Sequence, residues 1–297
     1  MIRLAVTTRA ETYERMQDPL AERSIRVTHV PTAERTLSPA GDLGEFDAGF
    51  VFPPRLAEGG VADALLGVPW VNNREQVLRS RYKAETLARL SAAGLPTPET
   101  VAVSDPVGES TLRETFDRFD PPVVVKPNSA TRGVGVTAVA DCDSFLGVCD
   151  YLDLVHDYRA TGDRSFLVQE YVDDARDYRV MVVDGSYAGA VERRLPDPDD
   201  ATDAASGPGE RVPTAPWKHN VHRGATARPV DLPTELRDLA ESAAAALGVP
   251  WLGVDLLVTD ERTVVNETNA RPTIDTARKY EPGFWDDVAA LVRRTAE

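Results

Sequence analysis

The sequence predicts an α/β unit at the N-terminus, followed by α+β units that are built largely on β-hairpins. Up to about residue 78, short apolar strands alternate with helical patterns, which is typical of a small parallel sheet. Strands are expected over 4–7, 25–30, 48–52 and 68–71, and helices over 11–20 and 56–66. The turn after the first strand, Thr7-Thr8-Arg9-Ala10, lacks the glycines of a dinucleotide site. The unit is therefore Rossmann-like in pattern without being a nicotinamide domain.

The charge balance narrows the class of partner. The 297 residues include 48 acids and 33 bases, a net charge of −15, which argues against binding to nucleic acid or to an anionic membrane. Only 4 of the bases are lysines, and the proteome of a salt-adapted, halophilic archaeon would have this balance. No apolar run reaches the roughly 18 residues of a membrane span, and Cys142 and Cys149 have no metal-binding or redox spacing. We therefore expect a cytoplasmic protein with two free thiols.

Two lysines mark a second unit over residues 79–168. Lys83 lies on a helix predicted over 79–93, which Gly94 and the following prolines close. After a strand at 100–103 and a helix near 110–119, an apolar strand over 121–127 carries Lys126 at its end. Burial of an unpaired ammonium is costly, so Lys126 needs an anion at this strand end. A structural salt bridge would also satisfy it.

A loop of small residues follows Lys126. Residues 128–136, Asn-Ser-Ala-Thr-Arg-Gly-Val-Gly-Val, hold Ser129, Arg132, Gly133 and Gly135 between two strands. The backbone N–H groups of such loops form concavities that bind phosphate, although Gly-x-Gly also occurs in many hairpins. The lysine beside the loop strengthens the case for an anion site.

The third unit, residues 169–297, begins where a strand over 166–172 leaves the second one. A hairpin follows, with strands over 177–183 and 187–193, and it carries Arg179 and Arg193 as candidate anion contacts or as ordinary surface bases. Residues 195–216 are a polar loop rich in Pro, Gly and Asp, either a mobile lid or a disordered segment. The donor-rich stretch 217–224 and a helix over 233–247 come next.

A second hairpin carries three oxygen ligands. Its strands are expected over 252–258 and 262–268, and a turn centred on Glu261 places Asp255 directly opposite Glu267. Asn269 points to the same face as Glu267, because side chains alternate along a strand, so the three groups lie about 5 Å apart. Facing carboxylates repel unless a cation lies between them, and hard oxygen ligands suit a magnesium ion that carries phosphates. A solvated hairpin with surface acids is the alternative.

The order of these motifs resembles one known superfamily. A lysine helix, Val-Val-Lys-Pro (124–127), a Ser/Gly loop, Gln-Glu-Tyr-Val (169–172), Asp-x-Arg (177–179), Asn-x-His-Arg-Gly (220–224), Gly-Val-Asp-Leu-Leu (253–257) and Asn-Glu-x-Asn-x-x-Pro (266–272) follow one another as in ATP-grasp proteins. The chain is most similar to the RimK-like glutamate ligases, over residues 70–290. The resemblance implies an ATP-grasp fold with an N-terminal Rossmann-like pre-ATP-grasp domain over 1–78. ATP would lie between two α+β subdomains.

The resemblance also implies a role for each motif, with ATP and Mg²⁺ or Mn²⁺ as cofactors. The implied nucleotide contacts are Lys83 and Lys126 at the phosphates, Ser129, Arg132, Gly133 and Gly135 in a flap over them, Gln169, Glu170, Tyr171 and Val172 around the adenine, and Asp177 and Arg179 on the substrate side. The implied metal ligands are Asp255, Glu267 and Asn269. The implied catalytic residues, which would face the γ-phosphate and the acyl intermediate, are Arg193, Asn220 and Arg223.

The reaction that the resemblance implies is the ATP-dependent ligation of a carboxylate to an amine. The carboxylate takes the γ-phosphoryl group, and the amine of an amino acid then displaces phosphate. Two alternatives keep the same fold: a kinase without an amine acceptor, and a nucleotide-binding regulator that has lost catalysis. The chain departs from the family pattern at Tyr82, where aspartate is usual, and at Thr273, where glycine is usual, which weakens glutamate as the assumed amine substrate. Enzymes that resemble this family are usually homo-oligomers.

Overall fold

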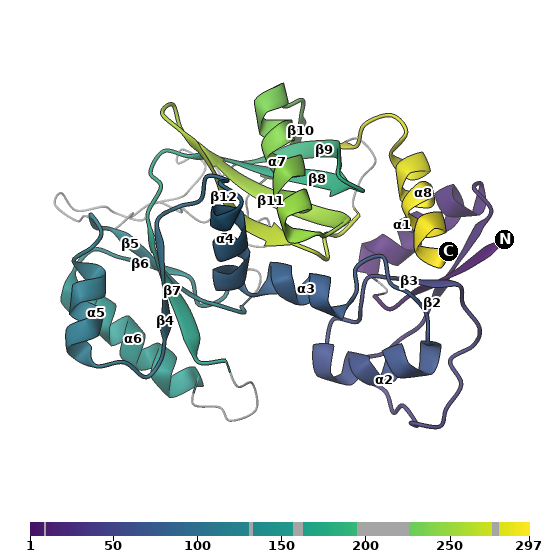
Figure 1. The fold of residues 1–297 in the computed structure, drawn as a ribbon, viewed down its shortest axis with the longest axis horizontal. Coiled ribbons are helices and arrows are strands. Elements are labelled where there is room, and N and C mark those ends of the chain that lie inside the picture. Colours follow the sequence, from purple (N-terminus) through teal and green to yellow (C-terminus); the bar gives the residue numbers. More distant parts are fainter. Residues whose placement is uncertain (9, 131–132, 157–162, 195–225, 275–278) are drawn as a thin grey trace, which may run out of the picture.

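The protein is built on three β-sheets, which the computed structural model arranges along the long axis of the molecule (Figure 1). The structure describes residues 1–8, 10–130, 133–156, 163–194, 226–274 and 279–297. This part of the chain contains a three-stranded, a five-stranded and a four-stranded sheet. In Figure 1 the five-stranded sheet lies between the other two.

The N-terminal sheet is parallel, as the alternation of strands and helices predicts. Its strands, in the order β2-β1-β3, are β1 (Ile2–Val6), β2 (Ile25–His29) and β3 (Ala48–Phe50). Its first two helices are α1 (Ala10–Ala21) and α2 (Leu56–Leu66). The fourth strand predicted over 68–71 is wrong, because within that segment Trp70 alone bridges to Gly49. Pro69 has no N–H with which to extend this ladder.

The four-stranded sheet contains the strand that ends beyond Lys126. Its members pair antiparallel in the order β4 (Thr100–Ser104), β7 (Ser165–Glu170), β5 (Val123–Pro127) and β6 (Thr137–Val139). Two helices that contact each other complete the unit, α5 (Glu109–Phe116) and α6 (Cys142–His156). Val123, Phe145 and Phe166 lie in an apolar core of its own. Strand β5 is buried along its whole length, so Lys126 lies in the interior.

The five-stranded sheet carries the predicted carboxylate hairpin at one edge. It is antiparallel, in the order β10 (Thr226–Val230), β9 (Ser186–Arg194), β8 (Arg176–Val183), β11 (Trp251–Val258) and β12 (Thr263–Asn269). Both predicted hairpins, β8–β9 and β11–β12, are confirmed. Asp184 and Gly185 adopt positive φ angles at the turn of the first hairpin, as a tight turn requires. Helix α7 (Thr234–Leu247) packs on β8, β9 and β11.

The helix predicted over 79–93 is divided in two. The first part, α3 (Arg74–Arg81), ends at Tyr82, whose backbone is extended with φ −82° and ψ 101°. The second part, α4 (Lys83–Ala92), begins at the next residue. Asn128 accepts the first N–H groups of α4: its carbonyl oxygen accepts from Lys83 N at 3.1 Å, and its Oδ1 accepts from Ala84 N at 2.9 Å. The loop after β5 therefore caps the helix that begins with Lys83.

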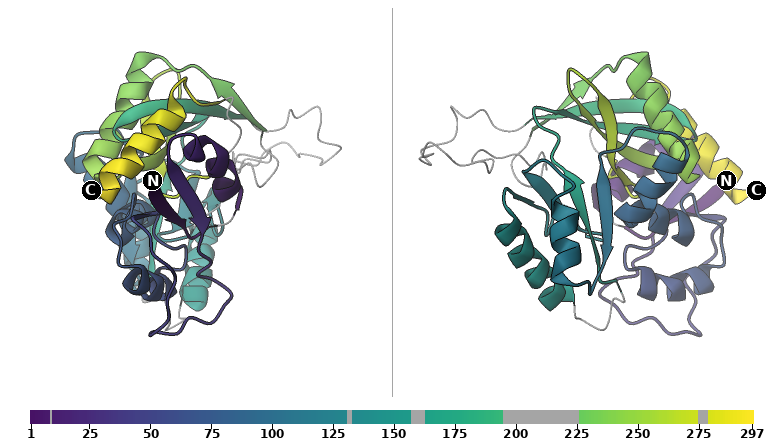
Figure 2. Two further views of the ribbon diagram at one scale, coloured as in Figure 1. Left: turned by 90° about the vertical axis from the view of Figure 1, so that its right-hand side faces the viewer. Right: turned by 60° about the vertical axis from the view of Figure 1, so that its left-hand side comes forward.

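Helix α8 (Phe284–Ala296) returns to the N-terminal unit. It packs against β1, β3 and α1, so the two termini lie on the same side of the molecule (Figures 1 and 2). The ring of Trp251, on β11, lies 5.3 Å from that of Phe50 and 6.1 Å from that of Phe284. One continuous apolar core thus joins the N-terminal and five-stranded sheets. The domain boundaries after residues 78 and 168 stay a prediction.

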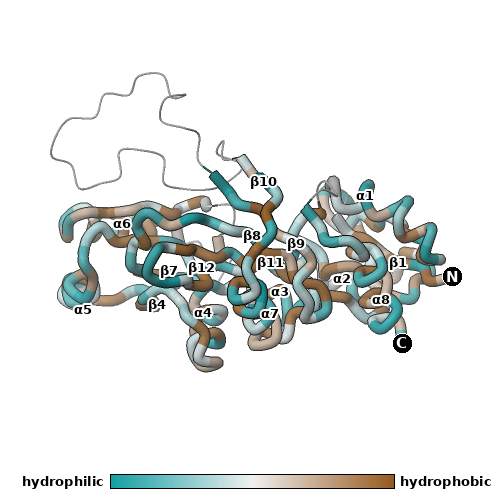
Figure 3. Tube along the Cα trace, turned by 90° about the horizontal axis from the view of Figure 1, so that it is seen from above, coloured by the Kyte–Doolittle hydropathy of each residue, from teal (hydrophilic) through white to brown (hydrophobic). Residues whose placement is uncertain are grey.

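The apolar residues follow the strands. Figure 3 shows hydrophobic segments along β11 and β1, in contrast to the mixed character of the outer helices. Strand β11 is buried from Trp251 to Leu256, which makes it the centre of the larger core. Among the helices of the described ranges, none is both long enough and apolar enough to cross a membrane.

Candidate active site

Lys83, at the first turn of α4, joins two edges of the candidate site. Its Nζ donates to the carbonyl oxygen of Ala130 at 2.7 Å and lies 3.0 Å from Oε1 of Glu267. The lysine is buried, whereas the side chain of Glu267 is 37% exposed. The loop after β5 and the strand β12 therefore meet at this ammonium group.

Lys126 is buried near the end of β5, and its partner is a neutral amide. Its Nζ donates to Oε1 of Gln169 at 2.8 Å, and Nε2 of Gln169 donates to Oγ1 of Thr100 at 2.8 Å. Burial lowers the pKa of Lys126 to about 8, an effect that Glu267 opposes and the like charge of Lys83 reinforces. Among the described residues, no carboxylate forms an ion pair with Lys126. The anion that its burial requires is thus not supplied by this part of the chain.

The loop after β5 is tightly folded at its glycines. Gly133 and Gly135 have φ angles of 67° and 73°, in the left-handed region that favours glycine. A Cβ atom on Gly135 would lie 2.7 Å from Cγ of Pro127, so a larger residue would push the loop away from β5. Ser129, earlier in the loop, hydrogen-bonds to the carboxylate of Asp163.

The predicted pairing of Asp255 with Glu267 is confirmed. The two residues are directly opposite each other in the β11–β12 ladder, and a register irregularity follows between Asp255 and Leu256. The cations that offset these carboxylates are side chains of the protein. Glu267 has Lys83, and Asp255 has two arginines.

The two arginines that hold Asp255 come from the β8–β9 hairpin. Nε and Nη2 of Arg179 donate to Oδ1 and Oδ2 of Asp255, each at 2.7 Å, and Nη2 of Arg193 donates to Oδ2 at 2.9 Å. Nη2 and Nε of Arg193 also donate to Oδ1 of Asp177, at 2.6 and 2.9 Å. The strand register explains the cluster, because Arg179 lies opposite Asp255 across β8–β11, and Arg193 lies opposite Asp177 across β8–β9.

The two aspartates of this cluster differ in how firmly they hold their charge. Burial opposes the ionisation of Asp255, but the charges of Arg179 and Arg193 outweigh it and lower the pKa of Asp255 to about 2. At Asp177 burial dominates and raises the pKa to about 6, against the attraction of Arg193. Asp255 is therefore the firmly ionised member of the pair.

The predicted adenine segment lies at the end of β7. Gln169 is buried, and the next residue, Glu170, forms an ion pair with Nη2 of Arg262 at 2.6 Å. Arg262 belongs to the turn between β11 and β12, so this pair links the four-stranded sheet to the carboxylate hairpin. Tyr171 and Val172 follow the strand and are half-buried, and burial raises the pKa of Tyr171.

The structure brings the described members of the predicted site into two neighbouring groups that Lys83 connects through Glu267. The first group, around the end of β5, is Lys83, Lys126, Gln169 and the loop with Ser129, Gly133 and Gly135. The second group, across β8, β9, β11 and β12, is Asp177, Arg179, Arg193, Asp255 and Glu267. Three predicted residues lie outside the described ranges, namely Arg132, Asn220 and Arg223.

Comparison with known proteins decides the family. Residues 80–282, well over half of the chain, match the RimK-like ATP-grasp domain. The chain belongs to the RimK-like ATP-grasp family. A probable alpha-L-glutamate ligase of Enterobacter sp. (strain 638) is 30% identical over 217 residues, which are 72% of this chain and 64% of that protein. The RimK-like chain thus matches less than two thirds of that relative's length.

Solved structures confirm the ATP-grasp fold predicted for this RimK-like chain. A D-cycloserine synthetase has a TM-score of 0.70 and 21% identity, with 99% of each chain covered. The D-alanine–D-alanine ligase from Bacillus anthracis, complexed with ATP, has a TM-score of 0.67 and 16% identity, with 100% of this chain and 97% of that chain covered. At sequence identities of 16% and 21%, this similarity is evidence for a shared fold.

The oxygen ligands expected in this RimK-like chain suit a magnesium ion that arrives with phosphates. Within the described ranges, no group of three His, Cys, Asp or Glu side chains is arranged to hold a metal ion by itself. Oδ1 of Asn269 accepts the backbone N–H of Arg271 at 2.8 Å, and Asp255 accepts from two arginines. Each carboxylate oxygen has two lone pairs, so Asp255 and Glu267 retain acceptor capacity. Mg²⁺ often takes one or two carboxylates and completes its shell with phosphate oxygens and water.

Two residues near the site are not indicated by any single sequence signal. Asn128 caps α4, and its only distinction in the sequence is its place directly after Lys126-Pro127. Arg271 lies at one of the x positions of the Asn-Glu-x-Asn-x-x-Pro motif. Its side chain extends from the end of the five-stranded sheet to the N-terminal unit, where it contacts Phe52 and Thr8. Burial and the charge of nearby Arg81 lower the pKa of Arg271 to about 10.

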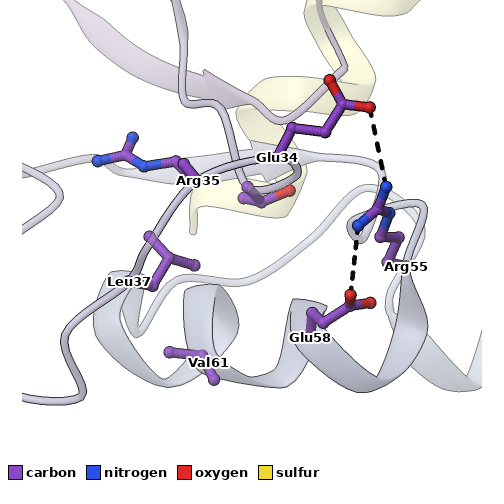
Figure 4. A pocket seen from close by; sticks show the side chains of 7 residues that line it. Glu34, Arg35, Leu37, Arg55, Glu58 and Val61 are labelled. Atoms are coloured by element: carbon purple, nitrogen blue, oxygen red, sulfur yellow. Dashed lines mark hydrogen bonds and ion pairs between the residues drawn. The ribbon is translucent and has the colours of Figure 1, made fainter.

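A cavity of about 290 Å³ opens elsewhere, on the N-terminal unit (Figure 4). The residues that line it are Thr32, Glu34, Arg35, Leu37, Arg55, Glu58 and Val61. Arg55 lies 3.8 Å from Glu34 and 3.4 Å from Glu58, so its charge is already compensated. None of the predicted site residues lines this cavity, and we assign no nucleotide to it.

Proposed function

We propose that this RimK-like protein is an ATP-dependent carboxylate–amine ligase that joins a carboxylate to the amine of an amino acid. The observation that carries the proposal is the buried ammonium of Lys126, whose described partner is the amide oxygen of Gln169. A nucleotide phosphate supplies the negative charge that this environment lacks. Membership of the family, and the similar fold of a ligase complexed with ATP, support this choice of ligand.

The phosphates would lie between Lys126, Lys83 and the glycine loop after β5. The two lysines come from different elements, and Asn128 ties these elements together by capping α4 from the end of β5. The positive φ angles of Gly133 and Gly135 give the loop a backbone shape that can turn N–H groups toward an anion. The adenine would lie beside residues 169–172.

The chemistry of ligation needs positive charge more than a nucleophilic side chain. An oxygen of the substrate carboxylate attacks the γ-phosphorus, the bond from that phosphorus to the bridging oxygen breaks, and ADP leaves with the electron pair. The amine of the second substrate then attacks the acyl carbon and loses a proton, and inorganic phosphate leaves. Lys83 and Lys126 offset charge on the phosphates in both steps.

The β11–β12 hairpin, with its two carboxylates, would bind a metal ion that contacts the same phosphates. Asp255, Glu267 and Asn269 would hold a magnesium ion, which adds positive charge at the β- and γ-phosphates. Arg179 and Arg193 lower the pKa of Asp255 to about 2, so this carboxylate carries its negative charge at neutral pH. Glu267 would exchange its contact with Lys83 for the metal as the lysine turns to the phosphates.

The amino acid to test first is glutamate, because several relatives are named probable alpha-L-glutamate ligases. Purified protein is incubated at high salt with ATP, magnesium, glutamate and short acidic peptides, and the release of phosphate is measured. Release that requires both a carboxylate and an amine supports the ligase. Release with a carboxylate alone indicates the kinase instead.

Glu267→Ala tests the metal side of the proposal. We expect turnover to fall to background while the fold stays intact, because the variant removes a ligand that is 37% exposed and makes one ion pair. The matched control is Glu261→Ala, which changes an exposed acid in the turn of the same hairpin. Unchanged turnover in Glu267→Ala would contradict the metal assignment.

A further inference from the structure

Arg271 reaches from the end of the five-stranded sheet to the N-terminal sheet. It lies two residues beyond the last residue of β12. Its Nη1 donates to the carbonyl oxygen of Phe52 at 2.5 Å, and its Nη2 donates to Oγ1 of Thr8 at 2.8 Å. A residue of the candidate active-site hairpin thus touches a unit to which no function has been assigned.

The place that Arg271 reaches is the ligand-binding edge expected of a parallel sheet. Thr8 lies two residues beyond β1, and Phe52 lies two residues beyond β3, so both mark the carboxyl ends of adjacent strands. From β1 the chain passes to β2 on one side and then crosses to β3 on the other. The crevice between β1 and β3 is therefore a topological switch point, where open α/β sheets bind ligands.

Several hydrogen-bond donors at this edge have capacity beyond the contacts of the described residues. A guanidinium has five N–H groups, and the contacts with Phe52 and Thr8 use two of those of Arg271. The hydroxyl of Thr8 accepts from Arg271, which leaves its own hydrogen to donate. Arg271 is half-buried, so these donors are within reach of a ligand.

Arg271 has no carboxylate partner in the part of the chain that the structure describes. The contacts of its guanidinium are with a carbonyl oxygen and a hydroxyl, and the like charge of Arg81 acts on it as well. In a chain with 48 acids against 33 bases, a half-buried guanidinium without an acid is unexpected. By contrast, Arg55 at the cavity of Figure 4 has both Glu34 and Glu58.

A purely structural role does not require an arginine here, because other residues already fasten this segment. Nδ2 of Asn72 donates to the carbonyl oxygens of Trp251 and Ala270, both at 2.6 Å. The N–H of Ile274 donates to Oγ1 of Thr12 at 3.1 Å. The segment is thus held to the N-terminal unit by neutral groups on either side of Arg271.

We propose that Arg271, with Thr8 beside it, binds a substrate carboxylate that takes no part in the reaction. The guanidinium fork and the hydroxyl match the two oxygens of a carboxylate. Arg271 is two residues from Asn269, so its Cα atom lies within about 7 Å of that of a proposed metal ligand. A carboxylate bound here would orient the rest of the substrate toward the phosphates.

The proposal rests on the ligase activity for the identity of its ligand, and two substrates could bring such a group. One is the amino acid, through its α-carboxylate, and the other is the acid, through a second carboxyl group. Both have the same recognition chemistry. The substrate whose KM rises on substitution of Arg271 identifies the source.

Binding of simple acids tests the site without any turnover. The probes are L-glutamate against isoglutamine, its α-amide, and succinate against succinamide, titrated calorimetrically into the full chain at constant high chloride. We expect the wild type to bind at least one acid about 10-fold more tightly than its amide, as charged hydrogen bonds imply. Arg271→Gln should remove this preference, and the control Arg55→Gln should keep it. A preference that survives in Arg271→Gln, or is absent from the wild type, overturns the proposal.

Milder variants protect the test against misfolding. Thr8→Val removes one hydroxyl from a residue at the crevice, and Arg271→Lys keeps the charge while losing the fork. We expect both to weaken binding of the acid about 3- to 10-fold, in line with the loss of one hydrogen bond to a charged group. Affinities equal to that of the wild type in both variants would refute the assignment.

The outcome also separates this site from the ligase proposal. Acid binding that depends on Arg271, in a protein that never releases phosphate from ATP, would retain the site and reject the ligase. Ligation that proceeds in Arg271→Gln with unchanged KM values for both substrates would retain the ligase and reject the site.

Discussion

Four cations of this protein form two groups that differ in how their charge is offset. Arg179 and Arg193 share Asp177 and Asp255 through hydrogen bonds of 2.6–2.9 Å, so each charge has an opposite neighbour. Lys126 has an amide oxygen. Arg271 has a carbonyl oxygen and a hydroxyl among the described residues.

We interpret the first group as part of the folded structure and the second group as binding sites for anionic ligands. A buried ion pair loses its balance when one partner is removed, whereas a buried cation without an acid is already at a disadvantage. Substitution in the first group should therefore cost stability in addition to any function, whereas substitution in the second should cost function without a loss of stability. The predictions that follow test this contrast, beginning with the largest effect.

Asp255→Ala should strongly destabilise the fold. Among the described residues, the change removes the ion-pair partner of Arg179 and leaves Arg193 paired with Asp177 alone. Loss of one partner of a buried ion pair costs about 3–5 kcal/mol of stability. Urea unfolding followed by fluorescence measures the effect, with the exposed turn residue in Asp260→Ala as control. A loss below about 1 kcal/mol, the value of a surface pair, would show that the cluster is not balanced as described.

Lys126→Met should reduce ATP-dependent turnover about 10²- to 10³-fold, as removal of a charge that stabilises a transition state does. Its free energy of unfolding should stay the same or rise, because the ammonium is buried beside Gln169 without an acid. Phosphate release and thermal unfolding provide the two readouts. Arg176→Met is the control, since this cation is 60% exposed and should affect neither. A severely destabilised Lys126→Met variant with intact turnover would contradict the assignment of Lys126 to ligand binding.

The pH dependence gives the smallest and most graded effect. With a pKa of about 8 against the ordinary 10.5 of a lysine, Lys126 loses its proton at lower pH in the folded chain than in the unfolded one. Between these values the unfolded chain binds more protons, so the contribution of Lys126 to stability rises with pH. ATP affinity should move the other way and fall about 10-fold between pH 7 and 9, as the ammonium is neutralised. Lys126→Met should lack both trends, and calorimetric titration with ATP at several pH values would detect them.

Patterns that act along one strand or across one hairpin were predictable from the sequence. The pairing of Asp255 with Glu267 needs only the turn centre and the alternation of side chains, and the structure has this register. The interior position of Lys126 follows from the apolar residues before it in β5. The same logic failed at residues 68–71, where Pro69 limits pairing to a bridge from Trp70.

Contacts between distant segments were not predictable. The helix breaks at Tyr82 because Asn128, from another sheet, accepts the first N–H groups of α4. The sequence pointed to a metal beside Asp255 but not to Arg179, which reaches this carboxylate through the pairing of β8 with β11. Arg271 shows the same limit, since no local pattern indicates that a residue after β12 reaches Thr8.

The packing of α8 on β1 and β3 has a consequence for the order in which the chain acquires its structure during synthesis. Strands β1 and β3 obtain one of their covering helices only when residues 284–296 have been made. The core of the four-stranded unit is formed by residues between positions 103 and 168 of the chain. These residues have all been synthesised long before α8. The four-stranded unit can thus complete its core before the parallel sheet, although the strands of that sheet precede it in the chain.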